Sequence, residues 1–238
     1  MASLDERFGV PVYSVAEAAG CLGVPVSTLT TWGRGYVRRR ASGAESVANP
    51  VVTFVGAAER GPVVPFVGLA EGLVLAAFRK AGVPMQRIRP ALARLGEEIE
   101  LEHALASRRL YTDGAEVLYD FAERSGDTPE GRSARDLVVV RHGQRVFAEV
   151  VQSYLRRVEF AEDGYVRLIR LPIYTTAEVV VDPDRGFGQP VFVRGGARVE
   201  DVLAMFRAGE PLGVVSREFG VPQAHLEDAV RVALPSAA

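Results

Sequence analysis

The sequence predicts an α+β fold in three regions, and three observations support this prediction. Two short helical segments joined by a glycine turn lie near the N-terminus. After residue 136 short apolar runs replace the helical spacing, which predicts a small antiparallel β region. Helical spacing then returns, and it predicts three C-terminal helices. We therefore expect regions at 1–123, 136–194 and 195–238.

The N-terminal pair of helices has the local signals of a helix-turn-helix. Ser14 can cap the first helix, while Glu17 three residues later can reach back to the Ser14 amide. Gly23 ends this helix. In the second helix we expect Leu29 and Trp32 to face inward and small hydroxyl residues to face outward. Such a surface suits the major groove of DNA.

The residues after the second helix predict a wing. Glycines flank Arg34 and three consecutive arginines follow, a pattern that suits a loop along DNA phosphates. A helical packing module followed by a solvated arginine loop would have the same pattern, so both interpretations stay open. On the DNA-binding interpretation, the predicted contact residues are Ser27, Thr28, Thr30, Thr31, Arg34, Arg38, Arg39 and Arg40.

Composition and charge narrow the classes of function. The 238 residues contain no apolar run of about 18 residues and no signal peptide, so we expect a cytoplasmic protein without a membrane span. Cys21 is the only cysteine, which excludes an internal disulfide and a multi-cysteine zinc site. Residues 11–94 carry 10 basic and 4 acidic side chains, whereas residues 111–238 carry 15 and 20. This division suits a protein that touches nucleic acid at one end.

Between the wing and the β region, the pattern predicts one strand and two helices. Val51–Val55 is a short apolar run and is predicted as a strand. Helical spacing begins at Phe66 and should end at the Ala-Gly-Val-Pro sequence that starts at Ala81. A second helix is predicted from Met85 through Leu95.

The β region should contain several short strands. Leu137–Val140 and Val179–Val181 are continuous apolar runs. Val158–Phe160 and Tyr165–Leu171 flank an Asp-Gly pair, which favours a tight hairpin turn. Val146–Val151 fits either a strand or a short helix. We therefore predict a small antiparallel sheet within residues 136–194.

Three helices are predicted in the last region, at 199–206, 212–219 and 223–234. A Phe-Gly-Val-Pro turn between the last two gives the order of a second helix-turn-helix. Glu227 and Asp228 oppose only Arg231 on the final helix, and carboxylates facing phosphates are unfavourable. We expect this unit to serve protein interaction or dimerisation rather than DNA contact.

The chain shows two resemblances to known families. Residues 12–100 resemble the winged-helix DNA-binding domain of MerR-type regulators and phage excisionases. Residues 186–233 resemble the small C-terminal helix-turn-helix domain of one group of VapB-type antitoxins. The first resemblance rests on Tyr13-Ser-Val-Ala-Glu-Ala-Ala, Leu22-Gly-Val-Pro, Ser27-Thr-Leu and Trp32. The second rests on Gly188-Gln-Pro-Val-Phe-Val-Arg-Gly195, Arg198-Val-Glu-Asp-Val-Leu, Arg207-Ala-Gly-Glu and Phe219-Gly-Val-Pro.

The second resemblance implies an antitoxin. Such a protein would bind and silence a VapC-type toxin, which is a PIN-domain ribonuclease, and would bind the operator of its own operon, here as a homodimer. An antitoxin arginine entering the acidic metal cluster of that toxin would form strong charged contacts. The candidates are Arg194, Arg198 and Arg207. No cofactor and no metal site is implied for this chain.

Two other functions are compatible with parts of the sequence. The first is a free-standing MerR-like transcription regulator in which residues 136–194 form a pocket for a small ligand. The second is an enzyme, which we do not expect, because the chain has no glycine-rich phosphate loop and no Gly-x-Ser-x-Gly elbow. The three histidines lack the spacing of metal ligands; they are His103, His142 and His225. Four acidic residues that could suggest a cation site are expected to lie in a solvated loop; they are Asp182, Asp184, Glu200 and Asp201.

Overall fold

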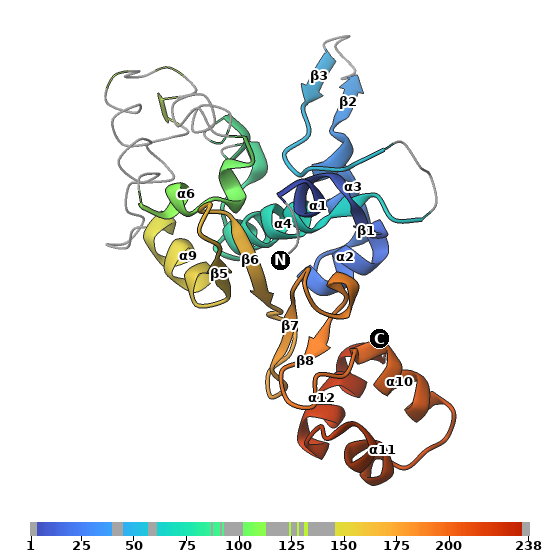
Figure 1. Cartoon of the computed structure of the whole chain (residues 1–238). Coiled ribbons are helices and arrows are strands. Elements are labelled where there is room, and N and C mark those ends of the chain that lie inside the picture. The colour runs from blue at the N-terminus through green and yellow to red at the C-terminus, as the bar shows by residue number, and fades with distance from the viewer. Residues whose placement is uncertain are drawn as a thin grey trace.

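The chain is arranged around α4 (Phe66–Lys80), the longest helix in the described part of the molecule. In this computed structural model, the N-terminal helices and a small sheet surround α4, and a three-helix lobe follows at the C-terminal end (Figure 1). The described residues are 4–39, 45–56, 61–86, 88–90, 92, 102–112, 124, 128, 131–132 and 146–234. None of the helices in these ranges has both the length and the apolar character needed to cross a membrane.

The N-terminal part forms the predicted helix-turn-helix. The Oγ of Ser14 accepts a hydrogen bond from the Glu17 amide at 3.2 Å, and a Glu17 carboxylate oxygen accepts one from the Ser14 amide at 2.7 Å. This capping box is therefore confirmed. Gly23 adopts φ 65° and ends the first helix, and Leu29 and Trp32 are buried as expected. The elements are α1 (Leu4–Gly9), β1 (Pro11–Tyr13), α2 (Val15–Leu22) and α3 (Val26–Arg34).

A hairpin follows α3 directly, at the position predicted for the wing. It consists of β2 (Tyr36–Arg39) and β3 (Glu45–Ala48), which pair antiparallel. In Figure 1 the hairpin projects from the body beside α3, at the opposite end of the molecule from the C-terminal lobe. A second small pairing joins β1 to β4 (Val64–Pro65), which leads straight into α4.

The strand predicted at Val51–Val55 is wrong, because this segment is a partly buried loop. The amides of Val51 and Val52 both donate to the carbonyl of Trp32, at 2.8 and 3.2 Å, and Val52 is 3% exposed. The apolar run therefore covers the end of α3 instead of pairing in a sheet. An apolar run predicts that a segment is buried, but it does not predict which kind of packing buries it. Here the segment packs against α3.

Helix α4 confirms the helix predicted from Phe66, and it packs against α9 (Val146–Leu155). The segment left open between strand and helix at Val146–Val151 is thus helical. Of the helix predicted from Met85 through Leu95, residues 85, 86, 88–90 and 92 are described, and all of them are helical. Two short elements between α4 and α9 are η1 (Ala104–Ala106) and α6 (Arg108–Thr112). The strand predicted at Leu137–Val140 lies outside the described residues.

The predicted antiparallel sheet is present, with four strands in the order β5-β6-β7-β8. Its first two strands form the expected hairpin, and Gly164 in the turn has φ 83°. The sheet and the N-terminal helices share one core, and the buried guanidinium of Arg7 links them. This guanidinium donates to the Val166 carbonyl at 3.3 Å and pairs with Asp163. The strands are β5 (Val158–Phe160), β6 (Val166–Arg170), β7 (Val179–Val181) and β8 (Val191–Phe192), with η2 (Gly186–Gly188) before the last.

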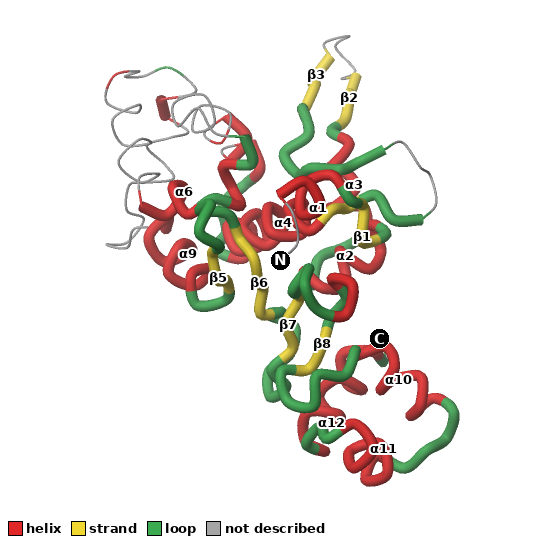
Figure 2. Tube along the Cα trace, viewed as in Figure 1, coloured by secondary structure: helices red, strands yellow, loops and turns green. Residues whose placement is uncertain are grey.

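Three helices complete the chain and form the C-terminal lobe (Figure 2). They are α10 (Val199–Arg207), α11 (Leu212–Phe219) and α12 (Gln223–Ala233). The lobe is attached to the sheet through Asp228, which is 2% exposed. One Asp228 carboxylate oxygen accepts hydrogen bonds from the amides of Thr175, Thr176 and Ala177, at 2.8, 2.7 and 2.9 Å.

The inward position of Asp228 corrects the electrostatic argument made for the final helix. Both Glu227 and Asp228 were expected to face any bound phosphate, but only Glu227 is exposed. Asp228 is directed at the loop between β6 and β7, and Arg231 donates to its other oxygen at 3.1 Å. Repulsion of phosphate by α12 therefore comes from one carboxylate instead of two.

Candidate nucleic-acid interface

The face of α3 opposite its buried side carries half of the predicted DNA-contact residues. Leu29, Trp32 and Gly33 are buried on one side of the helix. At about 100° per residue, the residues rotated by roughly 100–180° from these three form the opposite side. That side consists of Ser27, Thr30, Thr31 and Arg34, and the structure thus brings four of the eight predicted residues together on one helix face.

The threonine hydroxyls on this face make hydrogen bonds within the helix. Thr30 Oγ1 donates to the Val26 carbonyl and Thr31 Oγ1 donates to the Ser27 carbonyl, each at 2.8 Å. Such bonds to the preceding turn use the hydroxyl proton. What remains for a base edge is an acceptor lone pair and a methyl group, which suit an amino donor and the thymine methyl group respectively.

Thr28 occupies a different place from the other predicted residues. It is half-buried, as Thr30 and Thr31 are, but unlike them it lines a cavity between α3, α4 and α9. Its rotation about the helix axis places it at the border of the exposed face, on the side of the protein interior. The expectation that Thr28 faces outward with Thr30 and Thr31 therefore holds only in part.

Two glycines explain how the hairpin can follow α3 so closely. A Cβ atom on Gly33 would lie 2.2 Å from the ring of Phe54, and one on Gly35 would lie 2.2 Å from the Ala48 carbonyl oxygen. Gly35 also has φ 67°, which favours glycine. The sequence analysis interpreted these glycines as part of a loop along DNA phosphates, and in the structure they permit two close approaches at the base of the hairpin.

The hairpin holds part of the arginine run. Arg38 and Arg39 lie in β2, where they pair in register with Ser46 and Glu45, and Arg40 lies outside the described residues. Val37 and Val47 face each other across the two strands, and both are 64% exposed. The hairpin therefore presents an apolar cross-strand pair to its surroundings as well as the backbone of an arginine-rich strand.

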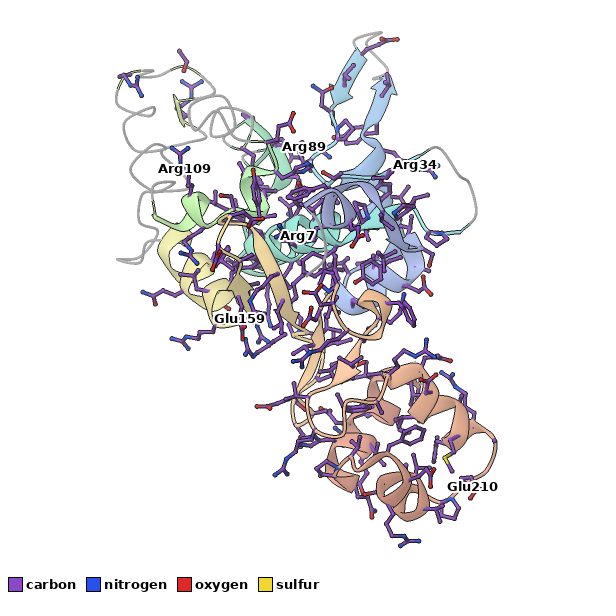
Figure 3. The ribbon with its side chains drawn as sticks, in the orientation of Figure 1. Arg7, Arg34, Arg89, Arg109, Glu159 and Glu210 are labelled. Carbon is purple, nitrogen blue, oxygen red and sulfur yellow. The ribbon has the colours of Figure 1, made fainter. Side chains whose placement is uncertain are left out.

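Arg89 was not among the predicted site residues, yet it joins α3 to the hairpin. Its guanidinium donates to the carbonyls of Asn49 and, at 3.2 Å, Thr31, and lies 5.9 Å from the centre of the Tyr36 ring. Figure 3 shows Arg34 and Arg89 near the base of the hairpin, on opposite sides of it in that view. In the sequence Arg89 was one arginine of several, and no local signal distinguished it.

A buried carboxylate supports the loop beneath α3. Glu71 of α4, 5% exposed, accepts hydrogen bonds from the Thr53 amide at 2.6 Å and from the Thr53 hydroxyl at 3.2 Å. The Nδ1 atom of His103 lies 3.0 Å from the same carboxylate. His103 has φ 54°, which is unusual for a residue other than glycine, and thus belongs to a strained support structure. Within the described ranges, no group of three or more His, Cys, Asp or Glu side chains is placed to hold a metal ion.

The three arginines predicted for toxin contact differ in their surroundings. Arg198 forms two hydrogen bonds with Asp201, at 2.8 and 2.7 Å, and Arg207 pairs with Glu200 at 2.7 Å. Arg194 is exposed, and no described carboxylate lies within ion-pair distance of it. Arg198 and Arg207 are therefore already paired with the two acidic residues of α10, whereas Arg194 is exposed to a partner protein.

Comparison with known proteins finds two matching families and two similar mycobacterial proteins. Residues 11–92 match the family described as "Putative DNA-binding HTH domain", and residues 179–233 match "Protein of unknown function (DUF433)". The chain is 50% identical over 232 residues to the Mycobacterium tuberculosis protein named "Putative antitoxin VapB45", with 95% of each chain covered. It is 26% identical over 231 residues to "Uncharacterized protein Rv2308" of the same organism, covering 92% of this chain and 88% of that one.

A solved structure has the same fold over almost its whole length. The crystal structure of Rv2018 from Mycobacterium tuberculosis matches with a TM-score of 0.78 at 48% sequence identity, and the match covers 94% of this chain and 99% of that chain. The N-terminal family match includes α2, α3 and the β2–β3 hairpin. This chain therefore belongs to the family of the mycobacterial VapB45 protein and has an N-terminal helix-turn-helix domain.

Proposed function

We propose that this chain is the antitoxin of a toxin–antitoxin pair and that it binds operator DNA through α3 and the β2–β3 hairpin. The relative named as an antitoxin and the helix-turn-helix family match support this proposal. The observation that carries the DNA-binding part is the exposed face of α3, beside a hairpin with consecutive arginines. The protein acts as a regulator by binding, without catalysing a reaction.

Each part of the interface has a role in this proposal. The α3 residues contact base edges and sugars, and the hairpin arginines hold phosphates, with Thr28 at the edge of the contact. The contacting region is 1–123, a MerR-like winged helix domain. A homodimer would place two such domains on half-sites about one helical turn apart, or a multiple of that distance.

The C-terminal region, 195–238, is proposed to bind a VapC-type PIN-domain ribonuclease or to mediate dimerisation, with 136–194 joining it to the DNA-binding domain. Of the three candidate arginines, Arg194 is favoured for toxin contact. Arg198 and Arg207 already form ion pairs with Asp201 and Glu200, and these pairs would have to break before either arginine reached a toxin carboxylate.

DNA binding is tested by footprinting the promoter of the operon that contains this gene. Arg34→Ala should weaken binding to the protected sequence by about tenfold or more, since a base contact contributes roughly 1–3 kcal/mol. Arg38→Ala should weaken binding to every sequence and reduce the slope of the salt dependence by about one phosphate contact. Arg185→Ala is the matched control, because this exposed arginine lies in the segment between β7 and β8. No protected site at low salt would contradict the proposal.

Toxin binding is tested by co-expression with the neighbouring open reading frame, with the tag on this chain alone. We expect a stoichiometric PIN-domain partner whose ribonuclease activity is suppressed in the complex. Arg194→Gln should weaken the complex more than Arg207→Gln, which removes an arginine already paired with Glu200. Specific promoter binding without a partner would instead favour a free-standing MerR-like regulator.

A further inference from the structure

A cavity of about 640 Å³ lies where α3, α4 and α9 meet. Its apolar wall includes Leu22 at the end of α2, Val24 from the following turn, Leu73 and Ala77 from α4, and Ile173 from the loop after β6. Sites for small molecules usually have volumes of roughly 300–1,000 Å³ and mainly apolar walls with a few polar groups. The cavity has the size and the lining of such a site.

The polar groups of the cavity are mostly cationic. Arg79 and Lys80 at the end of α4 and Arg157 just after α9 line it, and no carboxylate is found among the described lining residues. Arg79 donates to the Val83 carbonyl at 3.2 Å. Neither Lys80 nor Arg157 has an ion-pair partner among the residues that the structure describes. Two positive charges at the cavity are therefore not compensated by any side chain that the structure describes.

A second depression, of about 440 Å³, extends this electropositive surface. It shares Ser153 and Arg157 with the cavity and adds Arg156 and Arg170, of which Arg170 pairs with Glu159 at 2.6 Å. A purely structural role for these cations would be to stabilise the C-terminal ends of α4 and α9, each of which carries about half a negative charge. Among the described residues, five cations line the two depressions, and the two helix ends together with Glu159 supply only about two negative charges against them.

We propose that this cavity binds a small organic anion with an apolar body. The apolar part would lie against Leu73, Ala77 and Ile173, and the anionic group would be held by Lys80 and Arg157. Because Thr28 of α3 lines the same cavity, a bound anion also contacts the helix that we propose to enter DNA. Binding of the anion itself does not rest on the proposed function, since it needs neither DNA nor toxin.

The test is isothermal titration calorimetry of the full chain with three ligands of equal chain length, the two anions kept below their critical micelle concentrations and the alcohol below its solubility limit. Decanoate and decyl phosphate carry the anion on two different groups, and decanol lacks the charge. We expect one site per chain that binds at least one of the two anions about tenfold or more tightly than decanol. Equal binding of anions and decanol, or binding at many sites, would overturn the proposal.

Variants locate the site. Arg157→Gln and, separately, Lys80→Gln should each remove most of the preference for the anion over decanol, and Lys80 is exposed, so its replacement leaves the fold intact. Ala77→Phe should weaken the binding of anions and of decanol alike, because the ring would occupy the space beside the apolar wall. Arg217→Gln, on the exposed surface of α11, is the matched control and should bind like the unmodified chain. Unchanged anion binding in both Lys80→Gln and Arg157→Gln would refute the assignment to this cavity.

Discussion

Replacing Asp228 with alanine should loosen the C-terminal lobe from the sheet. In the folded chain this carboxylate accepts three backbone N–H groups, from Thr175, Thr176 and Ala177, and these contacts join α12 to the loop between β6 and β7. The Thr175 hydroxyl donates to it as well, at 3.1 Å. Alanine removes the acceptor of all four hydrogen bonds at once and offers these donors no replacement.

The expected loss follows from the burial of the three amides. Ala177 is buried, so its amide would be left without a partner, a penalty of roughly 1–3 kcal/mol. Thr175 and Thr176 are exposed, so water can replace the carboxylate, and each loss should be about 0.5–1.5 kcal/mol. The free energy of unfolding should therefore fall by roughly 2–6 kcal/mol in total.

Urea unfolding followed by circular dichroism measures this loss, and amide hydrogen exchange at Thr175–Ala177 locates it. Glu227→Ala is the matched control: the neighbouring carboxylate is exposed and accepts only a hydrogen bond from Gln223, so the change should stay within about 0.5 kcal/mol. A loss below about 1 kcal/mol for Asp228→Ala, with unchanged exchange at the three amides, would refute the reasoning.

The same carboxylate predicts a pH dependence. Burial by itself raises the pKa of Asp228, but the hydrogen bonds from Ala177, Thr176 and Thr175 outweigh it and lower the pKa below the ordinary value. In the unfolded chain the pKa is about 3.9. The stabilisation is therefore present above about pH 4 and is lost as the pH falls through the folded-state pKa. The difference between the wild-type chain and Asp228→Ala should shrink in that range.

Three further outcomes can be measured on the purified chain. Gly33→Ala should lower the free energy of unfolding by about 1–3 kcal/mol, since the new Cβ would lie 2.2 Å from the Phe54 ring. Gly20→Ala, on open helix surface, should raise the free energy of unfolding by about 0.5–1 kcal/mol. Glu71→Gln should destabilise the chain by about 1–3 kcal/mol in urea, because a buried charged acceptor is lost, and a change near zero would contradict its supporting role. Burial, with Glu17 nearby, raises the pKa of the Cys21 thiol to about 12, so Ellman's reagent at pH 8 should label Cys21 only after unfolding; rapid labelling of the folded chain would show an accessible thiolate.

Local signals sufficed for the elements whose interactions lie within a few residues of the chain. The Ser14–Glu17 capping box and the αL glycine at Gly23 define α2, and the Asp-Gly turn before Tyr165 defines the β5–β6 hairpin. In each case the donor, the acceptor or the required backbone conformation can be read from neighbouring residue types. The sequence by itself therefore determined the helix-turn-helix, the hairpin in the sheet and the amphipathic face of α3.

Other features depended on partners that are distant in the sequence. Arg89 reaches the Thr31 carbonyl across 58 positions, and the Asp228 carboxylate reaches the Thr175 amide across 53. Whether a charged side chain faces solvent or forms buried hydrogen bonds depends on which segment packs against it. The neighbouring residues in the sequence do not determine which segment that is. The same holds for the loop at Val51–Val55, whose apolar residues are buried under α3 instead of in a sheet, because burial of apolar surface is non-directional and packing alone decides which surface covers it.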